Sequence, residues 1–359
     1  MYTTQRSGFS LIELAAVLTM SVSVTAILAP TMKGMRSQMR GVTSEGNLSA
    51  IGQAGAMYAM DNDNRIFSFS WVAGEPYVNL FNGRERTATS DYIATAWQTQ
   101  DILQRATGRI SGKGRILGPV GHLVGRRFSH LPLADYLGGN VSDPMWADPA
   151  DSNLLHWQQN PLEYFDQGNS FPYGNGLPDQ VGYDDDGNWA NNPIIQLWPF
   201  SSSYQAVPFA WQRDFGNGTL FAPSAETPHL FSTVFNSPQT LGNRRYNEVR
   251  FPSAKVHMYE EFDREQAGSP YFAYDHAQSA KLMFDGSINT AMSGLAQSSV
   301  SPADYINGDK FVWEQTYIPL DTFPLPLGGL EDPTLLNQRF RWTLGGLQGI
   351  DYARTLFGR

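Results

Sequence analysis

Cysteine is absent from the 359-residue sequence, which excludes disulfides and thiolate metal sites. Histidine is scarce, and none of the six forms a His-x-x-x-His or similar pair that would bind a metal. The sequence also lacks a Gly-x-Ser-x-Gly nucleophile turn, and no pair of catalytic carboxylates can be recognised. We therefore predict that the protein is not an enzyme and holds no cofactor, apart from the calcium loop considered below.

Basic residues are outnumbered, because 25 Lys and Arg stand against 34 Asp and Glu and give a formal net charge of -9. An acidic chain of this kind is not expected to bind nucleic acid. With 34 Gly, 22 Pro and 13% aromatic residues, the chain is predicted to be rich in loops and turns, but folded.

Charge is almost absent from residues 9–32, where Glu13 is the only charged side chain. As a helix this run would be about 36 Å long, enough to cross a hydrocarbon core of about 30 Å. A carboxylate inside such a segment is costly, so we interpret Glu13 as functional. A short polar leader that ends in Gly8 precedes the run, and the aromatic Phe9 opens it.

This junction resembles the prepilin-type cleavage and methylation signal of type IV pilins and type II secretion pseudopilins. The resemblance implies that a membrane peptidase cuts after Gly8 and methylates the new amino terminus at Phe9. It also implies that Glu13, five positions into the mature chain, takes part in filament assembly, and that Pro30 kinks the helix. An ordinary secretory signal peptide and a plain signal anchor are the alternatives, but neither accounts for Glu13.

The chain is predicted to divide into three parts: a leader at 1–8, an N-terminal helix at 9–60 with a membrane-spanning half at 9–32, and a globular extracytoplasmic head at 61–359. In the amphipathic half of the helix, one face carries Leu48, Ile51, Gly55 and Tyr58. Turn-forming residues at 61–64 then end the helix.

The middle of the chain, residues 67–250, reads as short strands and long loops, and its tryptophans either bind sugars or proteins or anchor the core. The glycine-rich run 108–114 is one residue short of a phosphate-binding loop and is interpreted as a surface loop. Residues 182–188 resemble a calcium loop, but Gly182 stands where the first carboxylate ligand should be. Either this is an acidic turn, which we favour, or Asp184 and Asp186 are calcium ligands.

The C-terminal third gives the clearest strand signals. Residues 255–259 and 280–284 each alternate in polarity with period two, which is typical of strands. Asp285-Gly286 between the second run and residues 287–290 predicts a hairpin with a type I′ turn. The predicted fold class is therefore α+β, with the long N-terminal helix packed on an antiparallel β-sheet head that has long loops.

His276 followed by Asp285-Gly286 resembles a processing-associated His…Asp-Gly motif of large pseudopilin-like proteins, although eight residues intervene here where that family typically has nine. No chemistry follows from these residues, and a structural histidine beside a turn is favoured over a catalytic or metal role. The tail after residue 315 is predicted to lie extended along the head, with Phe340 and Trp342 as anchors.

The sequence thus predicts a pilin-like structural subunit of a type IV pilus or a type II secretion pseudopilus. By the resemblance, its partners are other pilin-like subunits, a prepilin peptidase and an inner-membrane assembly platform. The resemblance also places it in the inner membrane as a single-pass protein, with its head in the periplasm or on the cell surface. The alternative is a membrane-anchored periplasmic module that binds glycans or proteins, or an enzyme.

Overall fold

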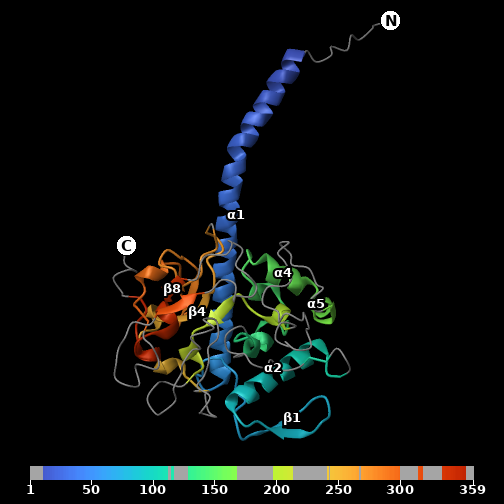
Figure 1. Cartoon of the computed structure of the whole chain (residues 1–359), viewed down its shortest axis with the longest axis vertical. Coiled ribbons are helices and arrows are strands. Elements are labelled where there is room, and N and C mark those ends of the chain that lie inside the picture. The colour runs from blue at the N-terminus through green and yellow to red at the C-terminus, as the bar shows by residue number, and fades with distance from the viewer. Residues whose placement is uncertain are drawn as a thin grey trace.

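A computed structural model describes most of the chain (Figure 1). The described residues are 11–111, 115–116, 128–167, 197–212, 241, 243–266, 268–299, 314–317 and 334–352. For residues 11–34, 166–167 and 314–317, only the backbone is described.

One helix, α1 (Leu11–Asp61), runs from the N-terminal end of the described chain into the head. Figure 1 shows its N-terminal part projecting from the head as a curved rod, and the helix continues through Pro30. Its C-terminal part contacts the 3-10 helix η1 (Leu131–Leu137) as well as β5 (Lys281–Met283) and β6 (Ile288–Asn289). In Figure 1, α2, α4 and α5 lie on one side of α1, and β4 and β8 lie on the other.

Burial of the C-terminal half of α1 follows the predicted stripe. Leu48 and Ile51 are fully buried, Gly55 is buried, and Tyr58 is half-buried. The helix ends at Asp61, one residue beyond the predicted end. The next turn places Asp63 and Asn64 in the left-handed conformation, with φ of 54° and 61°. Asp and Asn tolerate this conformation better than other residues with a side chain, so the predicted turn is confirmed.

The main sheet has four antiparallel strands in the order β3-β4-β5-β6. Its first two strands are β3 (Tyr204–Ala206) and β4 (Val256–Glu260). The mixed α+β class with antiparallel sheets is therefore confirmed, as are the two strands predicted from alternation. The alternation does not mark an exposed face, however. All five residues of β4 are buried, including His257, because other segments cover both faces of this strand.

The predicted type I′ turn between β5 and β6 is wrong, although the hairpin is present. Gly286 has a φ of 85°, and Asp285 is not among the described residues with positive φ. The amide of Gly286 donates to the carbonyl of Met283 at 3.0 Å, and the amide of Met283 donates to Ser287 at 2.8 Å. Three residues therefore form the loop, with glycine in the left-handed position of a turn with a bulge.

The prediction of only short strands and loops for residues 67–250 is also wrong, because three α-helices form there. These are α2 (Asp91–Thr107), α4 (Ser152–Gln159) and α5 (Pro161–Gln167). Ser90 caps α2 by accepting a hydrogen bond from the amide of Ile93 at 3.3 Å, and Gly108 ends it in a left-handed conformation. A short antiparallel pair precedes α2, formed by β1 (Pro76–Val78) and β2 (Glu85–Thr87).

The C-terminal segment packs against the head as predicted. A two-stranded antiparallel sheet joins β7 (Glu314–Tyr317) to β8 (Thr334–Asn337). Phe340 and Trp342 are buried, which confirms both as anchors. Trp342 packs edge-on against Phe209, with ring centroids 5.7 Å apart. The remaining described 3-10 helices are η2 (Pro144–Trp146), η5 (Trp198–Phe200), η6 (Pro208–Ala210), η7 (Tyr246–Glu248), η8 (Pro252–Ala254), η9 (Ser293–Leu295), η11 (Arg339–Trp342) and η12 (Gly346–Gln348).

Candidate functional site

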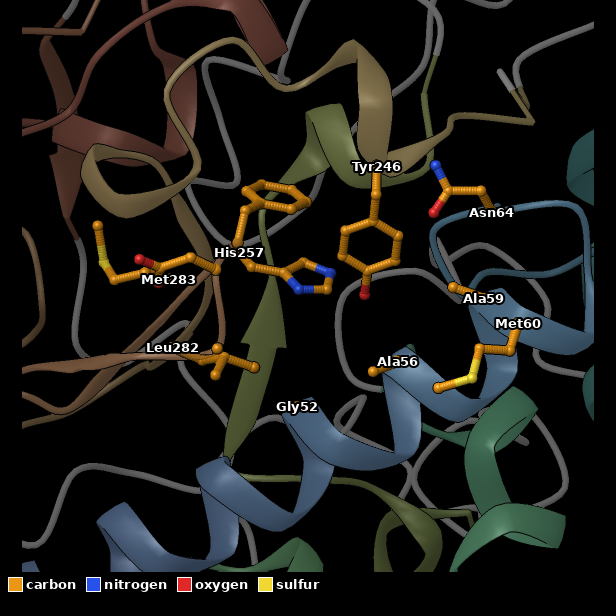
Figure 2. Close-up of a pocket in the computed structure, with 12 residues that line it drawn as sticks. Gly52, Ala56, Ala59, Met60, Asn64, Tyr246, His257, Leu282 and Met283 are labelled. Atoms are coloured by element: carbon orange, nitrogen blue, oxygen red, sulfur yellow. The ribbon is translucent and has the colours of Figure 1, made fainter.

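A cavity of about 530 Å³ lies between the C-terminal half of α1 and the β4–β6 part of the sheet (Figure 2). Small-molecule sites in proteins have volumes on the order of 300–1,000 Å³, so the cavity falls within that range. Its lining combines small and apolar residues with a few polar ones: Gly52, Ala56, Ala59, Met60, Asn64, Tyr246, His257, Leu282, Met283, Phe284, Asp285 and Gly286.

The helical wall of the cavity is built from small residues. Gly52, Ala56 and Ala59 are spaced at i, i+4 and i+7, which places them on one face of α1. A Cβ atom at Gly52 would lie 2.9 Å from Leu282 Cδ1, so glycine permits the close approach of α1 to β5. Small side chains at the other two positions leave space beside the helix.

The opposite side of the cavity is an aromatic wall formed by Tyr246, His257 and Phe284. The rings of His257 and Phe284 are stacked, with centroids 4.2 Å apart and an interplanar angle of 14°. Tyr246 stands perpendicular to His257 at 5.8 Å. Phe67 supports His257 from a third direction at 5.0 Å. These contacts hold the imidazole in one orientation, as Figure 2 shows.

Both polar groups of the aromatic wall are uncharged at neutral pH. Burial lowers the pKa of His257 from its ordinary 6.5 to about 3, because the cationic imidazolium is poorly solvated there. Burial likewise raises the pKa of Tyr246. The buried Nε2 atom of His257 has no hydrogen-bond partner among the described residues. A histidine with so low a pKa is a poor general base near pH 7, so the arrangement is suited to binding rather than to proton transfer.

The rim of the cavity includes part of the predicted His…Asp-Gly motif. Asp285 and Gly286 line it, and the carboxylate of Asp285 accepts hydrogen bonds from the amide and hydroxyl of Ser287 at 3.0 and 2.6 Å. His276 does not line it. That residue is exposed on a turn and has a ring contact with Tyr274 at 5.6 Å. The structure therefore separates the histidine of the motif from the cavity, and His257 is the cavity's histidine.

A second contact between α1 and the head is polar. We call this set the polar anchor: Ser44 and Asn47 of α1, with Tyr204 and Glu260 of the head. The hydroxyl of Ser44 donates to the carboxyl of Glu260 and lies 3.0 Å from the hydroxyl of Tyr204. Asn47 donates to the same hydroxyl at 3.2 Å. The amide of Ala280 donates to the second oxygen of Glu260 at 2.9 Å.

Glu260 of the polar anchor is 4% exposed. Burial raises its pKa well above the ordinary value, and the neighbouring carboxyl of Asp148 raises it further. The hydrogen bonds from Ser44 and Ala280 oppose this shift but do not outweigh it. The anchor therefore favours a protonated glutamic acid.

The predicted processing and assembly residues fall where little is described. Gly8 and Phe9 lie outside the described residues. Glu13 and Pro30 belong to α1, but their side chains are not described. In the part of the chain described with its side chains, no helix combines the length and apolar character needed to cross a membrane.

The candidate calcium ligands Asp184 and Asp186 also lie outside the described residues. Within the described ranges, no group of three or more histidine, aspartate or glutamate side chains is arranged to hold a metal ion.

The tryptophans divide between the core and the surface. Four are buried and serve as core residues: Trp146, Trp157, Trp198 and Trp211. Trp71 and Trp97 are only half-buried. Trp71 stacks on Tyr77 with centroids 4.2 Å apart, and the guanidinium of Arg86 lies 4.0 Å from the ring centroid of Trp97.

Sequence reasoning missed His257 as a site residue. Its signal was a polar residue inside an alternating run, which the period-two pattern could not distinguish from a solvent-facing position. Comparisons of the chain with models of protein families, with curated proteins and with solved structures found no match.

Proposed function

We propose that the chain is a pilin-like structural subunit, cut after Gly8, methylated at Phe9 and assembled into a type IV pilus-like or pseudopilus filament. The observation that carries the proposal is the form of α1. A single helix of 51 residues begins at Leu11, projects from the head and continues into it (Figure 1). Its projecting part contains most of the apolar run 9–32, and its C-terminal half is fixed among the head residues.

The exposed segment of α1 next to the head supports the same proposal. Met35, Met39 and Val42 are 60%, 68% and 69% exposed and follow the spacing i, i+4, i+7. Such an apolar stripe on a helix is costly to leave in water, and neighbouring subunits in a filament would cover it. The partners of the proposal are other pilin-like subunits, the prepilin peptidase and the inner-membrane assembly platform. The head would lie in the periplasm or at the cell surface.

The role of Glu13 follows from charge pairing. In lipid, its carboxylate carries a cost on the order of 2.5–3.5 kcal/mol on insertion scales. Cleavage after Gly8 creates a positive amine at Phe9, which the Glu13 of a neighbouring subunit can pair with. Pairing relieves the desolvation cost of both charges, so assembly gains an electrostatic contribution.

The experiment compares the native chain with Gly8→Arg and Glu13→Ala in cells that carry a prepilin peptidase. Mass spectrometry of the native protein should show a methylated N-terminus at Phe9. Gly8→Arg should stay uncut, because the peptidase requires close backbone approach at that position. Glu13→Ala should be cut normally but be missing from the sheared filament fraction. A mature chain that begins elsewhere, or normal incorporation of Glu13→Ala, would contradict the proposal.

The second candidate function is a membrane-anchored module that binds a ligand in the periplasm. The cavity beside His257 is the observation that favours it. The sheared fraction separates the two candidates, because a module of this kind would remain with the membrane whether or not Glu13 is present.

A further inference from the structure

We propose that the cavity between α1 and the β4–β6 part of the sheet binds a small, uncharged, mainly apolar molecule that carries one hydrogen-bonding group directed at His257. This goes beyond the proposed subunit role, because residues 8–13 take no part in the cavity and the cavity takes no part in cleavage.

The lining sets the character of the ligand's body. Gly52, Ala56 and Ala59 give a smooth helical wall, and Leu282 and Phe284 face it with apolar carbon. The stacked rings of His257 and Phe284 present a flat edge to the space (Figure 2). A planar or chain-like apolar body gains by leaving water for this environment, at roughly 25 cal/mol for each Å² buried.

His257 sets the need for a polar group. Its side chain is 2% exposed, and Nε2 has no hydrogen-bond partner among the described residues. A buried polar atom left without a partner is costly, so a ligand that supplies one would gain the hydrogen bond and remove the penalty. Figure 2 shows the Tyr246 hydroxyl directed towards α1 beside the imidazole, where it can contact the same ligand group.

The charges around the cavity exclude ionic ligands. No lysine or arginine lines it, and the one carboxylate, that of Asp285, is exposed at the rim, so an anion would find only repulsion. A cation would lose its water beside a neutral imidazole, without a buried carboxylate to replace that solvation. An uncharged ligand has neither cost.

The test uses two matched probes, 2-naphthol and 2-methylnaphthalene, which differ by a hydroxyl in place of a methyl group. The hydroxyl can donate or accept, so it suits either tautomer of His257. Equilibrium dialysis against the full chain should show tighter binding of 2-naphthol, by roughly fivefold, as expected for one net hydrogen bond of about 1 kcal/mol.

Two variants on adjacent exposed positions of α1 locate the binding. Ala56→Trp places a large ring at a cavity-lining position and should abolish uptake of both probes. Met57→Trp is the control, because Met57 is 44% exposed and does not line the cavity. It should bind like the native chain. Equal uptake by the native chain and Ala56→Trp would overturn the proposal, as would a native chain that binds neither probe.

His257→Phe tests the hydrogen bond. It keeps an aromatic ring against Phe284 but removes both nitrogens, so the two probes should bind equally. A fivefold preference for 2-naphthol that persists in this variant would show that His257 is not the partner and would overturn that assignment. Circular dichroism of each variant shows that the fold is retained. Should His257→Phe fail to fold, the comparison of Ala56→Trp with Met57→Trp still decides whether the cavity binds.

Discussion

The two contacts that α1 makes with the sheet side of the head differ in kind. At the polar anchor, Ser44 and Asn47 form directional hydrogen bonds with Tyr204 and Glu260. About three turns further along α1, the cavity has small residues on the helix and an imidazole nitrogen without a partner. Hydrogen bonds fix how far α1 can slide or rotate, whereas small residues leave space. The comparison teaches that one short contact can set the position of a helix while the next contact stays loosely filled.

The largest effect is expected where the two contacts meet. Ile51 is fully buried between the polar anchor and the cavity, so Ile51→Ala should lower the free energy of unfolding by about 2–5 kcal/mol through lost burial and a new void. Chemical denaturation measures this. Met57→Ala, on the exposed face of the same helix, should change stability by less than about 0.5 kcal/mol. Similar losses in both variants would mean that this part of α1 is not held by its buried face.

The cavity should weaken the protein in acid. The pKa of His257 is lowered from 6.5 to about 3, so the unfolded chain takes up a proton below pH 6.5 while the folded chain does not. This contribution is complete above pH 6.5. It falls by about 1.4 kcal/mol for each pH unit between 6.5 and 3. His257→Phe should flatten the pH profile by that amount. His130, which is buried with a similarly lowered pKa, remains in both proteins and cancels in the difference. Parallel profiles for the two proteins would contradict this.

The polar anchor should have the opposite pH dependence. The pKa of Glu260 is raised above 4.5, so from that pH upwards the unfolded chain loses a proton that the folded chain keeps. The contribution of Glu260 is complete below pH 4.5 and is lost as the pH rises towards the folded pKa, by at most about 1.4 kcal/mol per pH unit. Glu260→Gln cannot titrate, so its stability should fall less steeply above pH 4.5. Denaturation at a series of pH values checks the slope, and a steeper fall would reverse the assignment.

The smallest effect concerns the anchor's hydroxyl. Ser44→Ala removes the donor to Glu260 and should cost about 1 kcal/mol. The adjacent Thr43→Ala is the control, because the Thr43 hydroxyl is exposed and bonds only to the Met39 carbonyl of its own helix. It should be close to neutral. Thermal unfolding of the pair suffices, and equal melting temperatures would show that the anchor contributes no net stability.

Part of this fold could be predicted because its signals are local. The strands at 256–260 and 281–283 alternate in polarity, and Gly286 marks the turn. Helix α2 was missed for a physical reason. Several of its buried residues are polar, among them Thr99, Gln100 and Gln104, so no apolar stripe appears in the sequence. These side chains are hydrogen-bonded instead, and the Gln104 amide donates to the Ile116 carbonyl at 2.7 Å.

The cavity could not be predicted, because it depends on how distant segments meet. Gly52, Tyr246 and His257 are far apart in the chain, and nothing local to any of them marks a shared space. The capping residues Ser90 and Gly108, by contrast, were readable as the ends of α2.

The continuity of α1 has a mechanical consequence. A pull on its free end would load the head in shear, since the contacts at Ser44, Leu48, Ile51 and Ala54 follow one another along the helix axis. Contacts loaded in this way share the tension and must fail together, whereas a sideways pull would open them one at a time. Resistance to such a pull is governed by the rate of unfolding rather than by the equilibrium free energy. The joint between rod and head is therefore strongest along the rod's own direction.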